Sequence, residues 1–563
     1  MHSNTSRRTF VKGLAAGGLL GGLGLWRTPV WALTRPGEPQ MLTGSDFELF
    51  IGETPVNITG NPRTAMTING GIPGPLLRWR EGDTVTLRVK NRLKETTSIH
   101  WHGILLPANM DGVPGLSFHG IEPGGVYVYQ FQVRQNGTYW YHSHSGLQEQ
   151  SGVYGPLVID AKEPEPFEYD RDYVVMLTDW TDEDAASLMN TLKKQSDYYN
   201  YNKRTVGDFI DDVSKNGWAS TVADRKMWAE MKMNPTDLAD VSGATYTYLM
   251  NGQAPDSNWT GVFRPGEKLR LRFINGSAMT YFDVRIPGLK MTVVAADGLH
   301  VKPVSVDEFR IAVAETFDVI VEPTQDAYTV FAQSMDRTGY ARGTLAMKAG
   351  LSAPVPALDP RPLVTMDDMG MGGMDHGSMA GMDHSAMGGM QAHPATENDN
   401  PLVDMQAMST SPKLDDPGLG LRNNGRRVLT YSDLRSTFED PDGRDPSRTL
   451  ELHLTGHMEK FAWSFNGVKF SDAEPLRLKY GERVRIVLVN DTMMTHPIHL
   501  HGMWSDLEDE NGEFMVRKHT IDMPPGSRRS YRVTADALGR WAYHCHLLYH
   551  MEMGMFREVR VEE

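Results

Sequence analysis

Ten of the nineteen histidines stand in four short clusters, and the only cysteine of the chain lies inside one of them. In an extended strand residues i and i+2 point to the same face, so each His-x-His step presents two imidazoles side by side. Four such steps offer more ligands than the roughly four of a single closed metal site. The pattern therefore predicts a cluster of metal ions, held by His100, His102, His142, His144, His499, His501, His544 and His546.

The cysteine lies in the step HCH, where its two histidine neighbours face one side of the strand and Cys545 faces the other. His496 and His550 can join Cys545 in a His₂Cys site, with Met555 as a weak axial ligand. This ligand set indicates a blue-copper electron-transfer centre. An isolated Cys is often only a small buried hydrophobe, but here its backbone would connect two centres over a path on the order of 10 Å. An iron–sulfur site is excluded because one cysteine cannot hold it.

These residues need strands to position them, and the chain supplies three strand-rich blocks. Short alternating segments punctuated by Gly, Pro and Asn predict a sandwich or barrel in each block. The segments 81–91, 265–275 and 480–490 look like one strand that recurs once per block. We therefore expect three related all-β domains, with a polar, partly helical insertion over about 182–240. The predicted boundaries are 45–165 and 166–350 for the first two domains, 351–424 for a linker and 425–563 for the third domain.

Composition narrows the classes of function. The net charge is −15 and no long basic run is present, which makes nucleic acid a poor partner. One cysteine cannot form an internal disulfide. The N-terminus carries paired Arg7 and Arg8, then an apolar stretch of about 14 residues that is too short to span a bilayer, then small residues near Ala32. Residues 1–32 resemble a twin-arginine (Tat) export signal, and an uncleaved membrane anchor is the alternative.

The four motifs, in this order, resemble those of the multicopper oxidases over essentially the whole chain after the signal. The resemblance implies three cupredoxin-like Greek-key domains and four copper ions: one type 1, one type 2 and two type 3. Carried over by motif, the type 1 ligands are His496, Cys545, His550 and Met555, and the type 2 ligands are His100 and His499. The same motifs give His102, His142 and His546 to one type 3 ion and His144, His501 and His544 to the other. The middle domain has no such motif, and its His300 is expected to be structural.

Within this family the export signal, the Met-rich linker and the segments HPIHLHGMWSDLE and TGHMEKFAWSFNG look like the periplasmic copper-resistance oxidases of the CopA type. The resemblance implies oxidation of Cu(I), or of phenols as in laccases, coupled to four-electron reduction of O₂ to water. It also implies a periplasmic monomer without stable membrane insertion, exported by the Tat machinery, with periplasmic copper-handling proteins as partners. Asp111 matches a family acid that assists proton delivery, and Glu552 is a second candidate.

A segment of Met, Gly, Asp and His spans residues 366–393 and is predicted to be disordered without a ligand. Thioethers prefer Cu(I), and imidazole accepts either oxidation state, so the segment could capture substrate copper. Its candidate ligands are Met366, Met369, Met371, Met374, His376, Met379, Met382, His384, Met387, Met390 and His393. Met494 is a further candidate, although Thr492 stands where a related cuprous oxidase has an acid, with Asp491 one place earlier. A copper-sequestering protein that acts mainly through this segment is the competing hypothesis.

Overall fold

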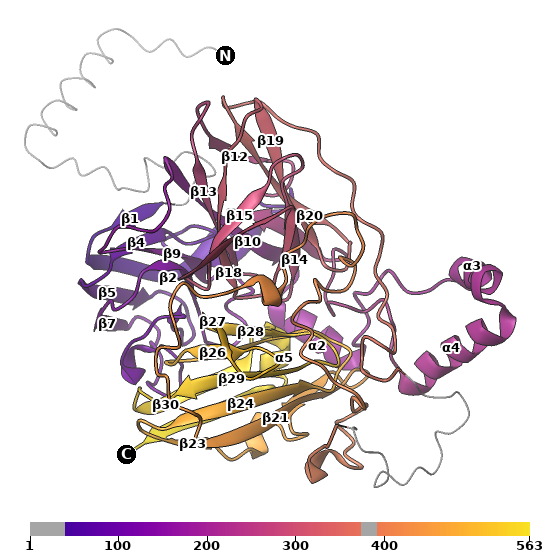
Figure 1. Cartoon of the computed structure of the whole chain (residues 1–563). Coiled ribbons are helices and arrows are strands. Elements are labelled where there is room, and N and C mark those ends of the chain that lie inside the picture. The colour runs from indigo at the N-terminus through magenta and orange to yellow at the C-terminus, as the bar shows by residue number, and fades with distance from the viewer. Residues whose placement is uncertain (1–39, 373–390) are drawn as a thin grey trace, which may run out of the picture.

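The computed structural model describes residues 40–372 and 391–563 of the chain. The predicted export signal and Met374, His376, Met379, Met382, His384, Met387 and Met390 lie outside the described residues. Within them six sheets form three β-sandwiches, numbered here in chain order. Figure 1 shows the first sandwich in indigo to purple, the second above it and the third, in orange to yellow, below. The all-β prediction is confirmed.

The first sandwich pairs a five-stranded sheet with a four-stranded one. The five-stranded sheet has the order β1 (Met41–Thr43), β4 (Leu76–Arg80), β9 (Tyr154–Asp160), β8 (Gly137–His142) and β6 (His100–His102). The other sheet has the order β3 (Arg63–Ile68), β2 (Asp46–Val56), β5 (Thr84–Asn91) and β7 (Val126–Gln132). Two of the His-x-His steps belong to this sandwich, on β6 and at the end of β8.

The second sandwich carries none of the four histidine motifs. One sheet has the order β11 (Tyr246–Met250), β10 (Arg171–Thr181), β13 (Leu269–Asn275), β18 (Thr316–Val321), β15 (Met291–Ala296) and β16 (Leu299–Val306). The other has the order β12 (Trp259–Val262), β20 (Tyr340–Ala346), β19 (Ala327–Ser334), β14 (Phe282–Arg285) and β17 (Glu308–Ile311). His300, on β16, packs edge-on against Phe167, and the structural role expected of it stays a prediction.

The third sandwich carries the other two His-x-His steps. One sheet has the order β22 (Ala462–Phe465), β21 (Arg448–His457), β24 (Arg483–Asn490), β29 (Arg528–Thr534), β26 (Ser505–Glu508) and β27 (Phe514–Lys518). The other has the order β23 (Leu476–Lys479), β31 (Phe556–Glu562), β30 (Gly539–Cys545), β25 (His496–Leu500) and β28 (Thr520–Met523). The steps belong to β25 and β30, which are neighbours.

The recurring strand that the sequence predicted is β5, β13 and β24, and all three occupy the same place. Each pairs in parallel with one neighbour and antiparallel with the other. Each ends in an asparagine, Asn91, Asn275 or Asn490, whose side-chain amide donates to two backbone carbonyls. Because the same side-chain amide holds two backbone carbonyls at the same place in each sandwich, it fixes the same turn three times.

The insertion in the second block is helical, as predicted, and contains α2 (Ala185–Lys194), α3 (Val206–Asn216) and α4 (Trp218–Met231). Figure 1 shows α3 and α4 standing out from the body, while α2 lies against it near α5 (Leu548–Glu552). Short 3-10 turns η2 (Ala108–Met110), η3 (Ala395–Glu397), η4 (Tyr431–Asp433) and η5 (Phe470–Asp472) complete the elements. Among the described residues no helix is both long enough and apolar enough to cross a membrane.

The prediction that all of residues 366–393 lacks structure is wrong at both ends of that segment. Residues 366–372 form turns, in which Met369 is fully buried and Met366 and Met371 pack against the core. Methionine is a flexible apolar side chain that fills irregular gaps, so a Met-rich stretch can contribute to a core. At the other end His393 is held by Glu397 and Asp491.

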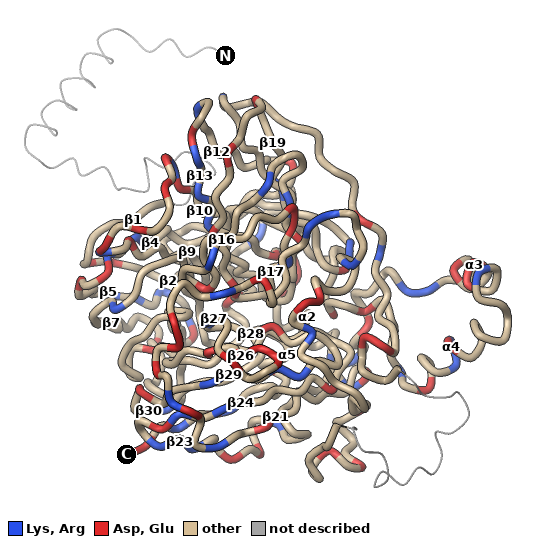
Figure 2. Tube along the Cα trace, viewed as in Figure 1, with Lys and Arg blue, Asp and Glu red and all other residues tan. Residues whose placement is uncertain are grey.

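Charge is mixed over the molecule. Figure 2 shows Lys and Arg interspersed with Asp and Glu along the described part of the trace, without a long stripe of one sign in this view. The absence of nucleic acid among the partners, expected from the net charge of −15, stays a prediction.

Candidate metal centres

The histidine motifs meet where the first and third sandwiches face each other. In the first sandwich β6 and β8 are antiparallel neighbours, and the register sets His100 opposite His142. In the third, β25 and β30 are antiparallel neighbours, with His499 opposite His544. Because alternate residues of a strand share a face, each His-x-His step directs both of its rings to the interface. Each sandwich thus contributes four imidazoles.

Two sets of ring contacts cross the interface. The Nε2 atom of His544 lies 3.3 Å from that of His144 and 3.1 Å from that of His501. On the other side of the cluster, His546 lies 4.9 Å from both His102 and His142 between ring centroids.

The remaining two histidines stack between these sets. The ring of His100 stacks on His501 with 3.9 Å between centroids, and the ring of His499 stacks on His102 at 3.8 Å. The structure therefore brings together all eight histidines that the sequence assigned to one cluster.

Hydrogen bonds orient the rings from outside the cluster. The carboxylate of Asp111, next to η2, accepts from Nδ1 of His501 at 2.8 Å, and its backbone carbonyl lies 2.8 Å from Nδ1 of His100. Glu149 holds Nδ1 of His142 at 2.8 Å. Such partners fix the tautomer that leaves Nε2 free for a metal ion. Asp111 was predicted from the sequence, whereas Glu149 has no distinguishing spacing and was missed.

Several inner nitrogens are buried and have no hydrogen-bond partner among the described residues. They are Nε2 of His100, His142, His499 and His546 and Nδ1 of His102. Burial lowers the pKa values of His102, His142, His144, His499, His501 and His546 well below the usual range, and the pKa of His544 to about 3. Neutral imidazoles with unsatisfied nitrogens are the state that binds a transition-metal ion.

A ninth histidine, His519, was not predicted and lies beside the cluster. Its Nδ1 is 3.2 Å from Nε2 of His102, and its backbone carbonyl accepts from Nδ1 of His499 at 2.6 Å. Burial lowers its pKa to about 4. His519 belongs to no His-x-His step, so only the fold reveals that it contacts two cluster rings.

The second centre forms around Cys545. Its Sγ lies 3.5 Å from Nδ1 of His496 and 4.0 Å from Nδ1 of His550, and the two Nδ1 atoms are 3.2 Å apart. Met555 is fully buried, and its carbonyl accepts from the backbone N–H of Cys545 at 3.1 Å. Burial raises the pKa of the Cys545 thiol, so a thiolate there needs a bound cation to stabilise it.

The Nε2 atoms of His496 and His550, which face away from Cys545, also have hydrogen-bond partners. Nε2 of His550 lies 2.6 Å from a carboxylate oxygen of Asp240, a buried residue at the end of the helical insertion. Nε2 of His496 lies 2.7 Å from the hydroxyl of Thr492. The ring of Trp463 stacks on His550 at 3.8 Å. Asp240 was missed because it is 310 residues away from His550 and belongs to no metal motif.

Two other predicted residues lie in different surroundings. Glu552 is exposed at the end of α5, and burial of part of its carboxyl raises its pKa. Met494 is buried, and its carbonyl accepts from the Asn490 side chain. The proton-relay role of Glu552 and the substrate-copper role of Met494 stay predictions.

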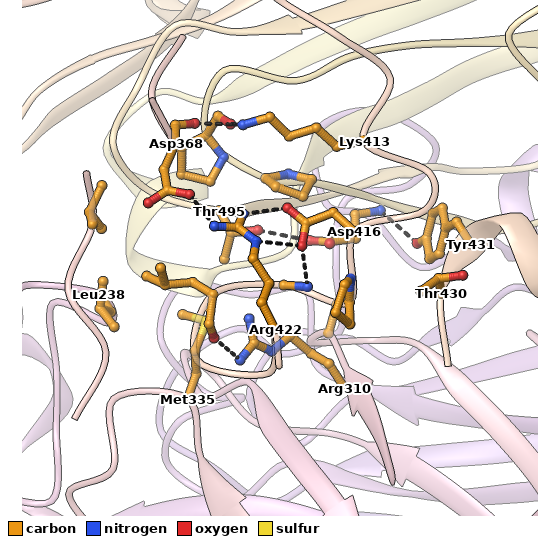
Figure 3. A pocket seen from close by; sticks show the side chains of 18 of the residues that line it. Leu238, Arg310, Met335, Asp368, Lys413, Asp416, Arg422, Thr430, Tyr431 and Thr495 are labelled. Atoms are coloured by element: carbon orange, nitrogen blue, oxygen red, sulfur yellow. Dashed lines mark hydrogen bonds and ion pairs between the residues drawn. The ribbon is translucent and has the colours of Figure 1, made fainter. Parts of the chain in front are cut away.

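A pocket opens where residues 411–431 pass between the second and third sandwiches. Leu238, Met335 and Thr495 line it, together with a network in which Arg422 pairs with Asp368 and Asp416 (Figure 3). Because these charged side chains are paired with one another, the network does not mark the pocket as a site for a charged ligand.

Comparison with known proteins gives the family. Models described as multicopper oxidase match residues 51–164, 171–350 and 443–563. The chain is 78% identical to the copper resistance protein A homolog of Pseudomonas syringae pv. tomato over 100% of both chains. It is 72% identical to copper resistance protein A of Escherichia coli over 99% of both. The chain therefore belongs to the multicopper oxidase family and is an oxidoreductase.

A solved structure agrees with the fold. The structure of Fet3p, described as a multicopper oxidase that functions in iron import, matches with a TM-score of 0.64 and 20% identity, over 93% of this chain and 91% of that one. The family implies four copper ions, and the residues fit them: the buried, unpartnered imidazole nitrogens and the Cys545 thiol are nitrogen and sulfur donors that copper prefers.

Proposed function

We propose that this chain is a periplasmic oxidase that uses O₂ to oxidise Cu(I) to Cu(II) and thereby confers copper tolerance. Full-length relatives at 72% and 78% identity are called copper resistance protein A, which supports this role. Bound copper would supply the one-electron steps that couple four substrate oxidations to the reduction of O₂ to two waters. Cys545 and its two histidine neighbours would connect the centre that accepts electrons to the cluster.

The proposed ligand assignment is the one carried over from the family motifs, and residues assigned to the same ion lie close together in the fold. His496, Cys545, His550 and Met555 would hold type 1 copper, and His100 and His499 would hold type 2 copper. The proposed type 3 ligands are His102, His142 and His546 for one ion and His144, His501 and His544 for the other. The three proposed domains and the linker keep the boundaries given above, with one sandwich in each domain.

The observation that favours Cu(I) over a phenol as the substrate is that the proposed type 1 histidines are buried beneath other side chains. His496 and His550 are both fully buried, and their outer nitrogens bond to Thr492 and Asp240. A bulky phenol therefore has no exposed imidazole edge to contact. A metal ion needs only a few donor atoms close to Asp240.

An open pocket offers such donors. Met233, Asp237 and Met458 line it, and the backbone N–H of Asp240 donates to the Asp237 carboxylate. Thioethers are soft ligands that prefer Cu(I). Burial raises the pKa of Asp237 well above its usual range, so this carboxyl becomes a charged ligand only when a cation takes the place of its proton. We propose that Cu(I) binds here and delivers its electron through Asp240 and His550. The Met-rich segment would supply ions to this pocket.

Protons for O₂ reduction have two proposed carriers beside the cluster. Asp111 and Glu149 each hold a cluster histidine with one carboxylate oxygen. The other oxygens, Oδ1 of Asp111 and Oε1 of Glu149, have no hydrogen-bond partner among the described residues. Burial raises the pKa of Glu149 well above its usual range, so this carboxyl can hold a proton at Oε1. Glu552 remains a further proposed carrier.

Oxygen uptake by the copper-loaded protein tests the proposal. With Cu(I) as reductant the wild type should consume one O₂ for every four Cu(I). Met233→Leu should raise the KM for Cu(I) and leave oxidation of a phenol unchanged, because a thioether ligand is lost at nearly constant volume. Met291→Leu is the matched control, since Met291 is buried in β15. If copper were bound without Cu(I)-dependent O₂ uptake, sequestration would be the better account.

A further inference from the structure

A second group of ionisable side chains lies outside both centres. It consists of His393, Glu397 at the end of η3, His453 in β21 and Asp491 directly after β24. Nδ1 of His393 lies 3.3 Å from Oε2 of Glu397 and 3.3 Å from Oδ2 of Asp491. Nδ1 of His453 lies 2.6 Å from Oδ2 of Asp491 and 3.7 Å from Oε1 of Glu397. Two imidazole nitrogens thus face the same two carboxylates.

The outer atoms of the two histidines are engaged elsewhere. Nε2 of His393 lies 3.0 Å from the backbone carbonyl of Ala407, and Nε2 of His453 lies 3.2 Å from a carboxylate oxygen of Glu451. In each case the acceptor favours a proton on Nε2, which leaves the lone pair of Nδ1 directed into the group. Metal-binding histidines almost always have such an outer partner.

The carboxylates are oriented in the same way. Oδ1 of Asp491 accepts from the backbone N–H of Ala407 at 2.8 Å, and Oε2 of Glu397 accepts from the Gln406 side chain at 3.2 Å. Oε1 of Glu397 has no hydrogen-bond partner among the described residues, although the side chain is 0% exposed. A fully buried, unsatisfied carboxylate oxygen that faces two imidazoles is costly unless a cation is present.

The spacing also suits an ion. Ligand bonds of about 2.0 Å place neighbouring donor atoms roughly 2.8 Å apart in the tetragonal geometry that Cu(II) prefers and roughly 3.3 Å apart in a tetrahedral site. The four distances, 2.6, 3.3, 3.3 and 3.7 Å, lie around these two values, and the longest has to shorten for a tetragonal ion. Small side-chain shifts are therefore enough to admit a metal ion.

We propose that His393, Glu397, His453 and Asp491 form a further metal site that binds Cu(II). The donor set is two imidazoles and two carboxylates, with no thiolate or thioether among the four, and such donors favour a divalent ion over Cu(I). Among divalent first-row metals copper binds most tightly to sites of this kind. The site is distinct from the ligand sets proposed for the four resident copper ions.

The position of the site suggests its use, and this step rests on the proposed function. Asp491 immediately precedes Thr492, whose hydroxyl bonds to His496 of the type 1 centre. His393 ends the Met-rich segment. The site would therefore receive Cu(II), the product of the reaction, close to the type 1 centre and with donors that differ from the thioethers of the pocket that binds Cu(I).

A buried ion-pair cluster without a metal is the competing explanation. Burial alone would lower the pKa of His393, but hydrogen bonds to Asp491 and Glu397 raise it to about 10. In the metal-free protein a proton can thus take the place of the ion. The two explanations differ in whether the protein binds one more Cu(II).

The test is a titration of the copper-loaded, oxidised protein with Cu(II) in the presence of a competing chelator. We expect one further ion per chain, with an electron paramagnetic resonance signal that shows coupling to two imidazole nitrogens. His393→Gln should weaken this binding at least about tenfold. Glu451→Gln, which removes the charge of the outer partner of His453 and of a surface ion pair with Arg528, should weaken it about tenfold to a hundredfold. His457→Gln, at the end of the same strand, is the control and should bind like the wild type.

Blue absorbance and melting temperature are recorded for every variant, so that loss of the fold is recognised. Glu451 lies near the surface, with a side chain that is 35% exposed, so its variant should fold even if a buried change does not. Equal Cu(II) binding by wild type, His393→Gln and Glu451→Gln would overturn the site and leave an ion-pair cluster only. A further ion in a protein without Cu(I)-dependent O₂ uptake would instead keep the site and overturn the proposed function.

Discussion

Asp111 links two cluster histidines through two different parts of one residue, and this makes Asp111→Asn an informative change. The backbone carbonyl contact to His100 persists in the variant, because it does not involve the side chain. The side-chain contact at 2.8 Å to His501 remains possible but loses its negative charge, and the same charge is lost from the oxygen that lies 3.3 Å from Nδ1 of His100. The variant therefore perturbs one side of the cluster, and the centre around Cys545 should be unchanged.

The magnitude follows from the hydrogen bond that changes. Hydrogen bonds to charged groups contribute about 1.5–3 kcal/mol, and neutral ones about 0.5–1.5 kcal/mol. The difference is about 1–1.5 kcal/mol, and about 1.4 kcal/mol corresponds to a factor of ten. Asp111→Asn should therefore slow reoxidation of the reduced protein by O₂ roughly tenfold. Loss of an acid that carries protons would add to this effect.

Rapid mixing separates the two half-reactions. Reduction of the blue centre by Cu(I) without O₂ should keep its wild-type rate, and return of the blue colour on mixing with O₂ should be slow. Asp240→Asn is the mirror control, because Asp240 contacts His550 of the other centre and should alter the reduction step. If Asp111→Asn slowed reduction and reoxidation equally, the separation of roles between the two groups of histidines would be refuted.

Three further predictions use the same measurements. Cys545→Ser should abolish the blue absorption and O₂ uptake while circular dichroism stays unchanged, and a blue variant would disprove the ligand assignment. His499→Ala should keep a blue centre that Cu(I) can reduce but O₂ cannot reoxidise, and loss of colour in proportion to activity would contradict this. Deletion of residues 373–390, which spares the packed ends of the Met-rich segment, should keep the blue band and four coppers. It should slow oxidation of dilute Cu(I) but not of a phenol, because tethered ligands raise the local copper concentration, and equal losses for both substrates would indicate damaged architecture.

The strand pattern and the histidine spacing were local properties, so the sequence alone determined them. Alternation at period two predicted strands such as β24 and also placed both rings of each His-x-His step on one face. His544, Cys545 and His546 are consecutive in the chain, so covalent bonds alone keep the predicted blue-copper centre next to the histidine cluster. The family resemblance then supplied the division of the ligands among four copper ions.

Tertiary structure decided every contact between residues that are distant in sequence. Asp240 meets His550 across 310 residues, and His519 meets His102 across 417. Neither Asp240 nor His519 belongs to a metal-ligand motif in the sequence. Each contacts a proposed ligand only because another sandwich or insertion packs beside it. The Met-rich segment shows the same limit, since composition predicted disorder but packing buried Met369. The period of the sequence pattern shows which face of a strand each side chain occupies. The residues that this side chain contacts in another domain depend on the free energy gained when distant surfaces are buried together.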